Sequence, residues 1–232
     1  MTLMLASVAN LAEARLVAEA GGDFIDLKNP ATGALGALDV NRVRDIVNTL
    51  QAGAADTPAT RPVFSATIGD LPLYPETVVP AVTGVAATGV HYVKIGFFPG
   101  GKPEAVLDAL RPVTAAGTAL IAVLFGDHPL DVSLIPRLAG CEFKGVMLDT
   151  QDKQRGSLTG QVSRDQLCVF IDTARTAGLM TGLAGSLRLD DIAGLVALKP
   201  DYLGFRGALC VGGRADALHP ARVRQVRAAL LA

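Results

Sequence analysis

The chain has 232 residues, of which 50% are hydrophobic and 19% are charged, and its formal net charge at pH 7 is −1. This composition excludes an intrinsically disordered chain, and the length suits one α/β barrel. The basic residues are scattered along the chain rather than clustered, so we expect no nucleic-acid partner.

Short apolar segments alternate with helical patterns from one end of the chain to the other. The predicted strands span residues 3–6, 24–27, 63–66, 92–95, 119–124, 145–148, 180–183 and 202–204. The predicted helices span residues 10–20, 40–50, 77–87, 103–115, 132–138, 163–177, 189–198 and 220–231. Asn10 and Ser163 are residue types that favour the N-cap, so we expect each to cap its helix. The polar segment 51–62, with its two prolines, predicts a surface loop.

Eight strand–helix alternations in a chain of this length predict the α/β class and a single (β/α)8 TIM barrel, one domain over 1–232. The main alternative is a doubly wound open sheet. Its first strand–helix turn would carry glycines in the pattern G-x-G-x-x-G, and the first turn here, 7–10, has none. The barrel is therefore the expected fold.

The N-terminal residues, the short apolar runs and the cysteines together predict a cytoplasmic protein. Residues 1–5 lack a basic region and a clear cleavage site, so we expect no secretory signal. The longest apolar run, 119–125, is far shorter than the roughly 20 residues that span a membrane, so we expect no membrane partner. Cys141, Cys168 and Cys210 are odd in number and widely spaced, which is typical of free thiols. Neither cysteines nor histidines have zinc-ligand spacing, so we expect no metal and no cofactor.

Polar residues follow or interrupt most of the predicted strands. In a (β/α)8 barrel, the carboxyl ends of the strands meet at one mouth, and active sites are built there. We expect this mouth to hold Ser7, Asp26, Lys28, Thr67, Asp70, Lys94, Asp149, Lys153, Ser186 and Arg206.

Two lysines in this set stand in or beside apolar strands. Asp26 and Lys28 project from the same face of an extended segment, and Lys94 lies within the apolar run 92–95. A buried ammonium must find a carboxylate or lose its proton, and a neutral lysine can attack a carbonyl. The lysines therefore indicate catalysis, with a structural ion-pair cluster that includes Asp26 and Asp149 as the alternative.

The loops after the seventh and eighth predicted strands favour phosphate binding. They contain Ala184-Gly185-Ser186 and Arg206-Gly207, and the second loop continues to Gly212-Gly213-Arg214. Barrel enzymes often bind phosphate through backbone N–H groups at these two strands, although glycine after a strand also forms simple turns. Lys153, on the polar loop 151–161, is either a solvated lysine or a residue that closes over the substrate.

Six short segments, in order along nearly the whole chain, carry a family resemblance. They are FIDLKNP (24–30), SATIGD (65–70), YVKIG (92–96), MLDT (147–150), LAGS (183–186) and GFRGALC (204–210). Together they resemble the (5-formylfuran-3-yl)methyl phosphate synthase family. The resemblance implies a barrel enzyme of methanofuran biosynthesis that condenses two molecules of glyceraldehyde 3-phosphate to a phosphorylated furan aldehyde, with loss of phosphate and water.

The resemblance also implies roles for individual residues. Lys28 would form a Schiff base with the substrate, Lys94 would shuttle protons, and Asp26, Asp149 and Lys153 would support the site. The expected substrate and phosphate contacts come from Ser7, Thr67, Asp70, Gly185, Ser186, Arg206 and Gly207, with the retained phosphate at the last three.

Two features depart from the family pattern. The segment 51–62 is longer than the family needs, and Val211 stands where relatives carry a basic residue. The main alternative function is a class I aldolase that uses the same lysines on another phosphosugar. A barrel isomerase and a non-catalytic phosphosugar-binding protein are further alternatives. The expected partner is in each case a small phosphosugar, and the sequence leaves open whether the chain forms a homo-oligomer.

Overall fold

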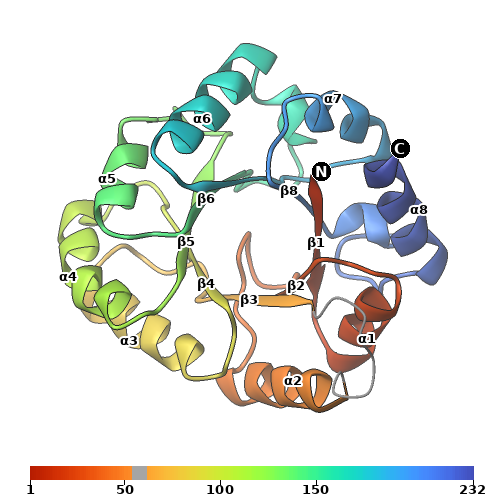
Figure 1. The fold of residues 1–232 in the computed structure, drawn as a ribbon, viewed down its shortest axis with the longest axis horizontal. Helices are drawn as coiled ribbons and strands as arrows, with labels where there is room; N and C mark the ends of the chain where they lie inside the picture. Colours follow the sequence, from red (N-terminus) through yellow and green to blue (C-terminus); the bar gives the residue numbers. More distant parts are fainter. Residues whose placement is uncertain (54–61) are drawn as a thin grey trace.

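Eight parallel strands close into a barrel in the computed structural model, which describes residues 1–53 and 62–232 (Figure 1). The strands are β1 (Leu3–Val8), β2 (Phe24–Leu27), β3 (Val63–Thr67), β4 (Tyr92–Gly96), β5 (Leu120–Phe125), β6 (Gly145–Asp149), β7 (Met180–Leu183) and β8 (Tyr202–Phe205). β8 pairs with β1, with Leu5 opposite Gly204, so the sheet has no edge. The predicted (β/α)8 TIM barrel is confirmed, and the open doubly wound sheet is excluded.

Each strand is followed by a helix, and the helices form the outer ring of Figure 1. They are α1 (Leu11–Glu19), α2 (Val40–Gly53), α3 (Pro75–Ala86), α4 (Pro103–Ala115), α5 (Leu134–Gly140), α6 (Arg164–Thr176), α7 (Ile192–Val196) and α8 (Pro220–Leu231). The 3-10 turns η2 (Leu158–Gly160), η3 (Leu189–Asp191) and η4 (Gly207–Leu209) lie in the loops after β6, β7 and β8.

Local sequence signals fix where these helices begin. The Asn10 side chain accepts a hydrogen bond from the backbone N–H of Glu13. Ser163 and Gln166 form a reciprocal capping box at the start of α6, so both predicted caps are confirmed. Proline opens three further helices, where its missing N–H costs nothing: Pro75, Pro103 and Pro220.

Most predicted elements begin and end within two residues of the observed ones, and the main differences lie at α7, α5 and α2. The predicted helix 189–198 divides into η3 and α7, because the Asp191 carboxylate binds the Ser157 and Thr159 hydroxyls and pins the first turn. α5 begins at Leu134 rather than 132, since the Asp131 side chain holds the preceding residues in a turn. Residues 51–53 of the predicted loop belong to α2, and the part at 54–61 lies outside the described residues.

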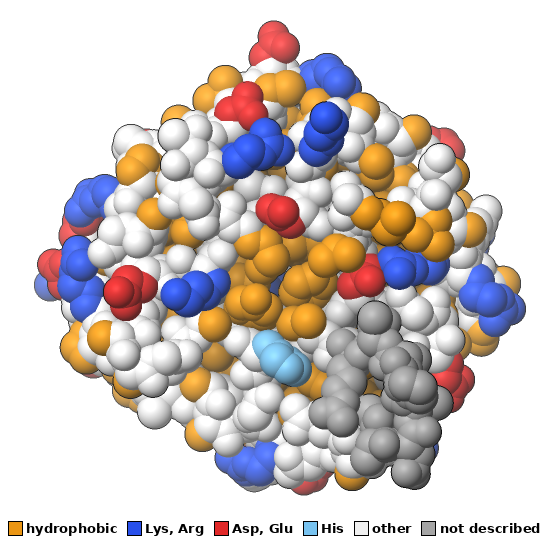
Figure 2. Space-filling model, in the orientation of Figure 1, with side chains coloured by type: hydrophobic (Ala, Val, Ile, Leu, Met, Phe, Trp, Pro, Cys, Tyr) orange, Lys and Arg blue, Asp and Glu red, His pale blue; other side chains and the backbone are white. Residues whose placement is uncertain are grey.

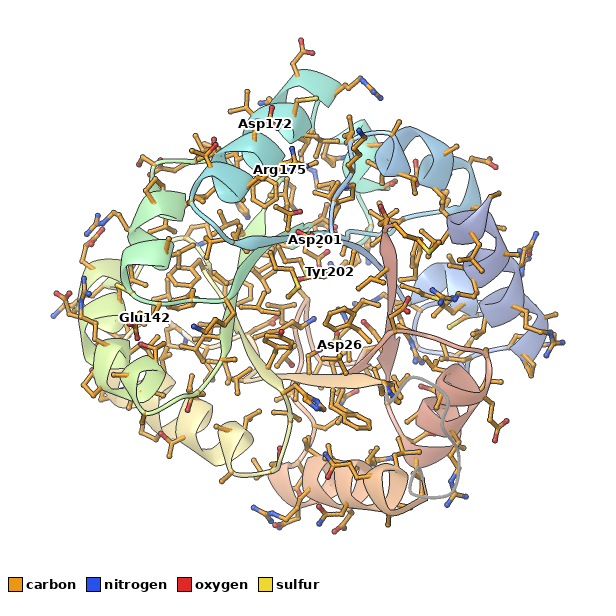
Figure 3. The ribbon with its side chains drawn as sticks, viewed as in Figure 1. Asp26, Glu142, Asp172, Arg175, Asp201 and Tyr202 are labelled. Atoms are coloured by element: carbon orange, nitrogen blue, oxygen red, sulfur yellow. The ribbon has the colours of Figure 1, made fainter. Side chains whose placement is uncertain are left out.

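The barrel interior has an apolar core of its own, separate from the layer between strands and helices. It contains Leu5, Phe24, Ile121, Val123, Met147 and Tyr202. The Tyr202 ring centroid lies 5.2 Å from that of Phe24, and burial raises the pKa of the Tyr202 phenol. A Cβ at Gly182 would lie 2.2 Å from the Tyr202 ring, so glycine makes room for it. Figure 3 shows Tyr202 and Asp26 inside the ring of strands, which is packed rather than hollow.

The surface carries charges of both signs. On the face shown in Figure 2, hydrophobic side chains gather over the barrel axis, and lysines, arginines and carboxylates are spread around them. No helix within 1–53 and 62–232 combines the length and the apolar character needed to cross a membrane.

Candidate active site

A cavity of about 580 Å³ opens where the strands end, and we call it the inner cavity. Nine of the twelve predicted site residues line it: Ser7, Lys28, Lys94, Asp149, Lys153, Gly185, Ser186, Arg206 and Gly207. Asp26, Thr67 and Asp70 do not line it. The convergence predicted from the ends of the strands is therefore observed for most of the set.

Asp26 and Lys94 form a buried ion pair beneath the inner cavity. The Lys94 Nζ lies 2.7 Å from the Asp26 Oδ1, and the two side chains are 1% and 0% exposed. The Ser65 hydroxyl donates to the same carboxylate at 2.7 Å, and the Ser7 hydroxyl donates at 3.0 Å. Burial alone would raise the pKa of the Asp26 carboxyl, but the charges of Lys94 and Lys28 and the hydrogen bonds from Lys94 and Ser65 hold it below its usual range. Ser7 thus supports Asp26 as well as lining the cavity.

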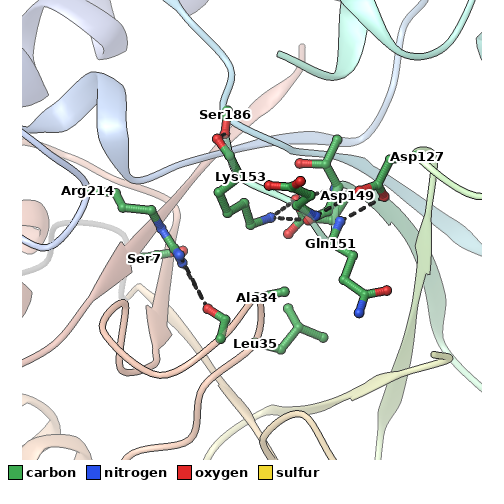
Figure 4. Close-up of polar contacts among 12 residues, drawn as sticks. Ser7, Ala34, Leu35, Asp127, Asp149, Gln151, Lys153, Ser186 and Arg214 are labelled. Carbon is green, nitrogen blue, oxygen red and sulfur yellow. Dashed lines mark hydrogen bonds and ion pairs between the residues drawn. The ribbon is translucent and has the colours of Figure 1, made fainter. Parts of the chain in front are cut away.

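Asp149 and Lys153 form a second ion pair on the other side of the inner cavity (Figure 4). Asp149 ends β6 and Lys153 follows four residues later, so the loop returns the amine to the carboxylate. The backbone N–H of Thr150 also donates to Asp149 at 2.7 Å. Burial would raise the pKa of the Asp149 carboxyl, yet Lys153 and Lys28 keep it low. The Lys153 side chain is only 11% exposed, so it is not a solvated loop lysine.

Lys28 stands between the two pairs without a partner of its own. It follows β2, and only 6% of the residue is exposed. Within the described residues, its amine forms no ion pair or hydrogen bond. Burial and the positive charges of Lys153 and Lys94 lower the pKa of Lys28, whereas the carboxylates of Asp149 and Asp26 raise it. The lowering effects are larger, and the pKa of Lys28 falls to about 8. Roughly a tenth of these amines are then neutral at pH 7.

The guanidinium of Arg206 is held by acceptors within the protein. Nε donates to the Arg214 carbonyl at 2.8 Å, and the two terminal nitrogens bind the buried Glu13 carboxylate at 2.5 and 3.2 Å. These nitrogens also donate to the carbonyls of Ser7 and Asp216, at 3.2 and 2.6 Å. An arginine has five N–H donors, and all five are used. These contacts favour a role for Arg206 in positioning the loop after β8, and its expected contact with a phosphate stays a prediction.

Thr67 and Asp70 also serve the backbone rather than the inner cavity. The Thr67 hydroxyl donates to the Gly36 carbonyl at 3.2 Å. The two Asp70 oxygens each accept a backbone N–H, from Ala34 and Leu35, both at 2.7 Å. Both side chains therefore shape the loop that follows Lys28, and their expected substrate contacts stay predictions.

The glycine loops at the mouth leave backbone donors free. Gly185 has a φ of +107°, and a Cβ there would lie 2.8 Å from the Thr150 Cγ2. The N–H groups of Gly185, Ser186 and Gly207 donate to no acceptor in the part of the chain that the structure describes. Such groups can bind a phosphate oxygen.

Several contributors were missed in the sequence. Ser65 lies two residues before Thr67 on β3, and the strand period of 2 could have placed it beside Asp26. Glu13 carries a charge on the buried side of α1, but nothing in the sequence links it to Arg206, 193 residues away. Arg188 and Arg222 also line the inner cavity and were missed, whereas Arg214, which lines it too, belongs to the loop that the sequence analysis named.

The arrangement is suited to carbonyl chemistry on phosphorylated substrates. It combines one buried amine with a lowered pKa, two carboxylate–amine pairs that can move protons, and free backbone donors beside arginines. Among residues 1–53 and 62–232, no three His, Cys, Asp or Glu side chains come together as metal ligands.

Comparison with known proteins gives the family. The 4-HFC-P synthase family model matches residues 4–227. A Methylorubrum extorquens protein, named as a proposed (5-formylfuran-3-yl)methyl phosphate synthase, is 42% identical over 99% of this chain and 92% of its own length. The (5-formylfuran-3-yl)methyl phosphate synthase of Methanopyrus kandleri is 36% identical over 90% of each chain.

Solved structures share the fold at low identity. A 3-hexulose-6-phosphate synthase superposes with a TM-score of 0.68 at 14% identity, over 98% of this chain and 100% of that one. Phosphoribosyl anthranilate isomerase from Thermus thermophilus gives a TM-score of 0.63 at 17% identity, over 100% and 98%. These two likenesses concern the barrel alone, whereas the family match covers almost every residue. The chain belongs to the 4-HFC-P synthase family.

Proposed function

We propose that the protein condenses two molecules of glyceraldehyde 3-phosphate into (5-formylfuran-3-yl)methyl phosphate through a Schiff base on Lys28. The reaction would be a step of methanofuran biosynthesis, in the cytoplasm as the cysteine pattern predicts. The observation that carries the proposal is the Lys28 amine, which is buried, unpaired among the described residues and lowered in pKa to about 8. Family membership supports the product.

The first step forms the imine. The neutral Lys28 Nζ adds to the carbonyl carbon of one triose phosphate, water leaves, and the nitrogen becomes a protonated imine. This cation draws electrons from the neighbouring carbon and makes its C–H bond acidic. The Asp26–Lys94 pair, 2.7 Å across, lies beneath the inner cavity and takes up that proton.

The second step expels one phosphate. The electron pair of the broken C–H bond forms a carbon–carbon double bond as phosphate leaves the next carbon, which gives an enol. The second triose phosphate first isomerises: a proton moves from its C2 to its C1 through an enediol, so that its carbonyl group lies at C2. The terminal carbon of the enol then adds to this C2 carbonyl carbon, which places the remaining phosphate arm at the 3-position of the ring. Ring closure and dehydration complete the furan, and the overall balance is the loss of one phosphate and two water molecules.

A lysine-to-arginine exchange tests the proposal. We expect Lys28→Arg to keep the positive charge and the fold but to lose product formation by at least about a thousandfold, since a guanidinium forms no imine. Release of phosphate and formation of the furan aldehyde are measured together. Lys144→Arg, an exposed lysine immediately before β6, serves as the matched control and should retain full activity. Product formation by Lys28→Arg at the wild-type rate would refute the Schiff base.

A class I aldolase on another phosphosugar is the second candidate, because the same buried amine would serve it. An aldolase reaction releases no inorganic phosphate, whereas the proposed condensation releases one phosphate for each product. The phosphate assay therefore separates the two functions.

A further inference from the structure

A second cavity, of about 780 Å³, lies beside the inner cavity at the mouth of the barrel, and we call it the outer cavity. Loops after β2, β3, β5, β6 and β8 form its walls. Lys153 and Arg214 line both cavities and therefore stand where they meet. Figure 4 shows Arg214 and the Ala34–Leu35 segment facing Lys153, Gln151 and Asp127 across this space. Both volumes lie in the range of small-molecule sites.

The carboxylates that line the outer cavity are already engaged by the protein. Asp70 accepts two backbone N–H groups, as described above. Asp127 accepts the backbone N–H groups of Gln151 and Asp152, at 2.8 and 2.7 Å. Asp152 accepts the N–H of Gln154 at 2.9 Å. These N–H donors offset much of the negative charge of the three carboxylates. The carboxylates therefore repel a bound anion less than unpaired ones would.

Two arginines of the outer cavity have guanidinium groups that an anion could recruit. Arg155 is exposed, and its guanidinium forms no hydrogen bond or ion pair with any residue in 1–53 or 62–232. Arg214 reaches across the mouth to the Gly33 carbonyl, where both contacts are long, at 3.3 Å. Arginine binds phosphate through paired N–H donors, so these groups would hold a phosphate well.

We propose that the outer cavity binds the second triose phosphate, with Arg155 and Arg214 on its phosphate and its carbonyl group directed toward Lys153. The inference rests on the proposed function, because only a condensation of two phosphorylated molecules needs two sites. The inner cavity holds the triose bound to Lys28, and the shared residues place the two substrates side by side.

The new carbon–carbon bond would form where the inner and outer cavities meet. The enol of the Lys28-bound triose supplies its carbon–carbon π electrons for the new bond, and the π electrons of the second carbonyl move onto its oxygen. That oxygen takes a proton from the Lys153–Asp149 pair, and the enol hydroxyl returns one to the pair. Lys153 is placed for this exchange, since two of its three N–H donors already bind Asp149 and the Thr150 carbonyl.

The test separates the binding of the two molecules. Borohydride trapping of the Lys28 adduct, followed against glyceraldehyde 3-phosphate concentration, reports the first molecule. The rate of furan formation, followed against the same concentration, depends on the binding of both molecules. We expect Arg155→Gln to leave half-saturation of trapping within about twofold of wild type and to raise half-saturation of furan formation by about tenfold or more. Arg42→Gln, which changes an exposed arginine on α2 that lines neither cavity, is the control.

Unchanged half-saturation of furan formation in Arg155→Gln would overturn the second site and leave the proposed function standing. A shift of both half-saturation values together would also overturn it, because one phosphate site would then serve both measurements. Absence of any Lys28 adduct in the wild-type protein would instead overturn the proposed function itself.

Discussion

At the scale of single residues, the main feature of the site is which of its three lysines have a carboxylate partner. Lys94 and Lys153 each have a carboxylate, and Lys28 has none within hydrogen-bonding reach among the described residues. Two neighbouring ammonium groups and burial favour the neutral amine at Lys28, because each disfavours the charged form. In the proposed mechanism, the unpaired lysine is therefore the nucleophile, and the paired lysines carry protons.

This charge balance predicts a pH dependence that a mutation should move. Only neutral Lys28 attacks a carbonyl, so the rate of adduct formation should rise with pH and level off above about 8. The Asp149 charge raises the pKa of Lys28, so Asp149→Asn should lower the midpoint by about one pH unit. The rate of trapping is measured from pH 6 to 10. An unmoved or raised midpoint would contradict this account of Lys28.

At the scale of elements, the loop after β8 is fastened to α1 by one buried charge pair. Arg206 binds Glu13, and Glu13 also accepts the backbone N–H groups of Ala9 and Leu218, at 2.8 and 3.3 Å. The pair therefore joins the beginning of the first helix to both ends of the loop that carries Arg214. Loss of either charge would leave the other buried without compensation.

We expect Glu13→Gln to lower the free energy of unfolding by about 3 kcal/mol or more, because the Arg206 charge would remain buried. Denaturant unfolding measures the change. Glu104→Gln removes an exposed ion pair with Arg137 and is the matched control, with an expected loss below about 1 kcal/mol. Equal losses in the two variants would show that burial of the Glu13–Arg206 pair carries no special weight.

At the scale of the whole molecule, the sequence is informative where local signals are strong. β2, β7, α4 and α8 have the predicted boundaries, because glycine or proline stands beside a clear apolar pattern. Lys28 and Lys94 stand out in the sequence because a charge within or directly after an apolar strand is unusual. α7 was harder to predict, since Asp191 takes its partners from the loop after β6.

Residue type alone did not show which polar side chains near the mouth have partners within the protein. Arg206, Thr67 and Asp70 all lie near the mouth, yet their polar atoms are used by Glu13 and by backbone groups. The partners are remote in sequence, and only the closed barrel brings them together. Position at a strand end thus locates a site more reliably than it assigns roles.

The most direct test of the central claim is to locate the covalent adduct. The wild-type protein is treated with glyceraldehyde 3-phosphate and borohydride, and peptide mass mapping identifies the modified lysine. The account predicts a reduced adduct on Lys28 and none on Lys94 or Lys153. An adduct on another lysine, or turnover without any adduct, would contradict it.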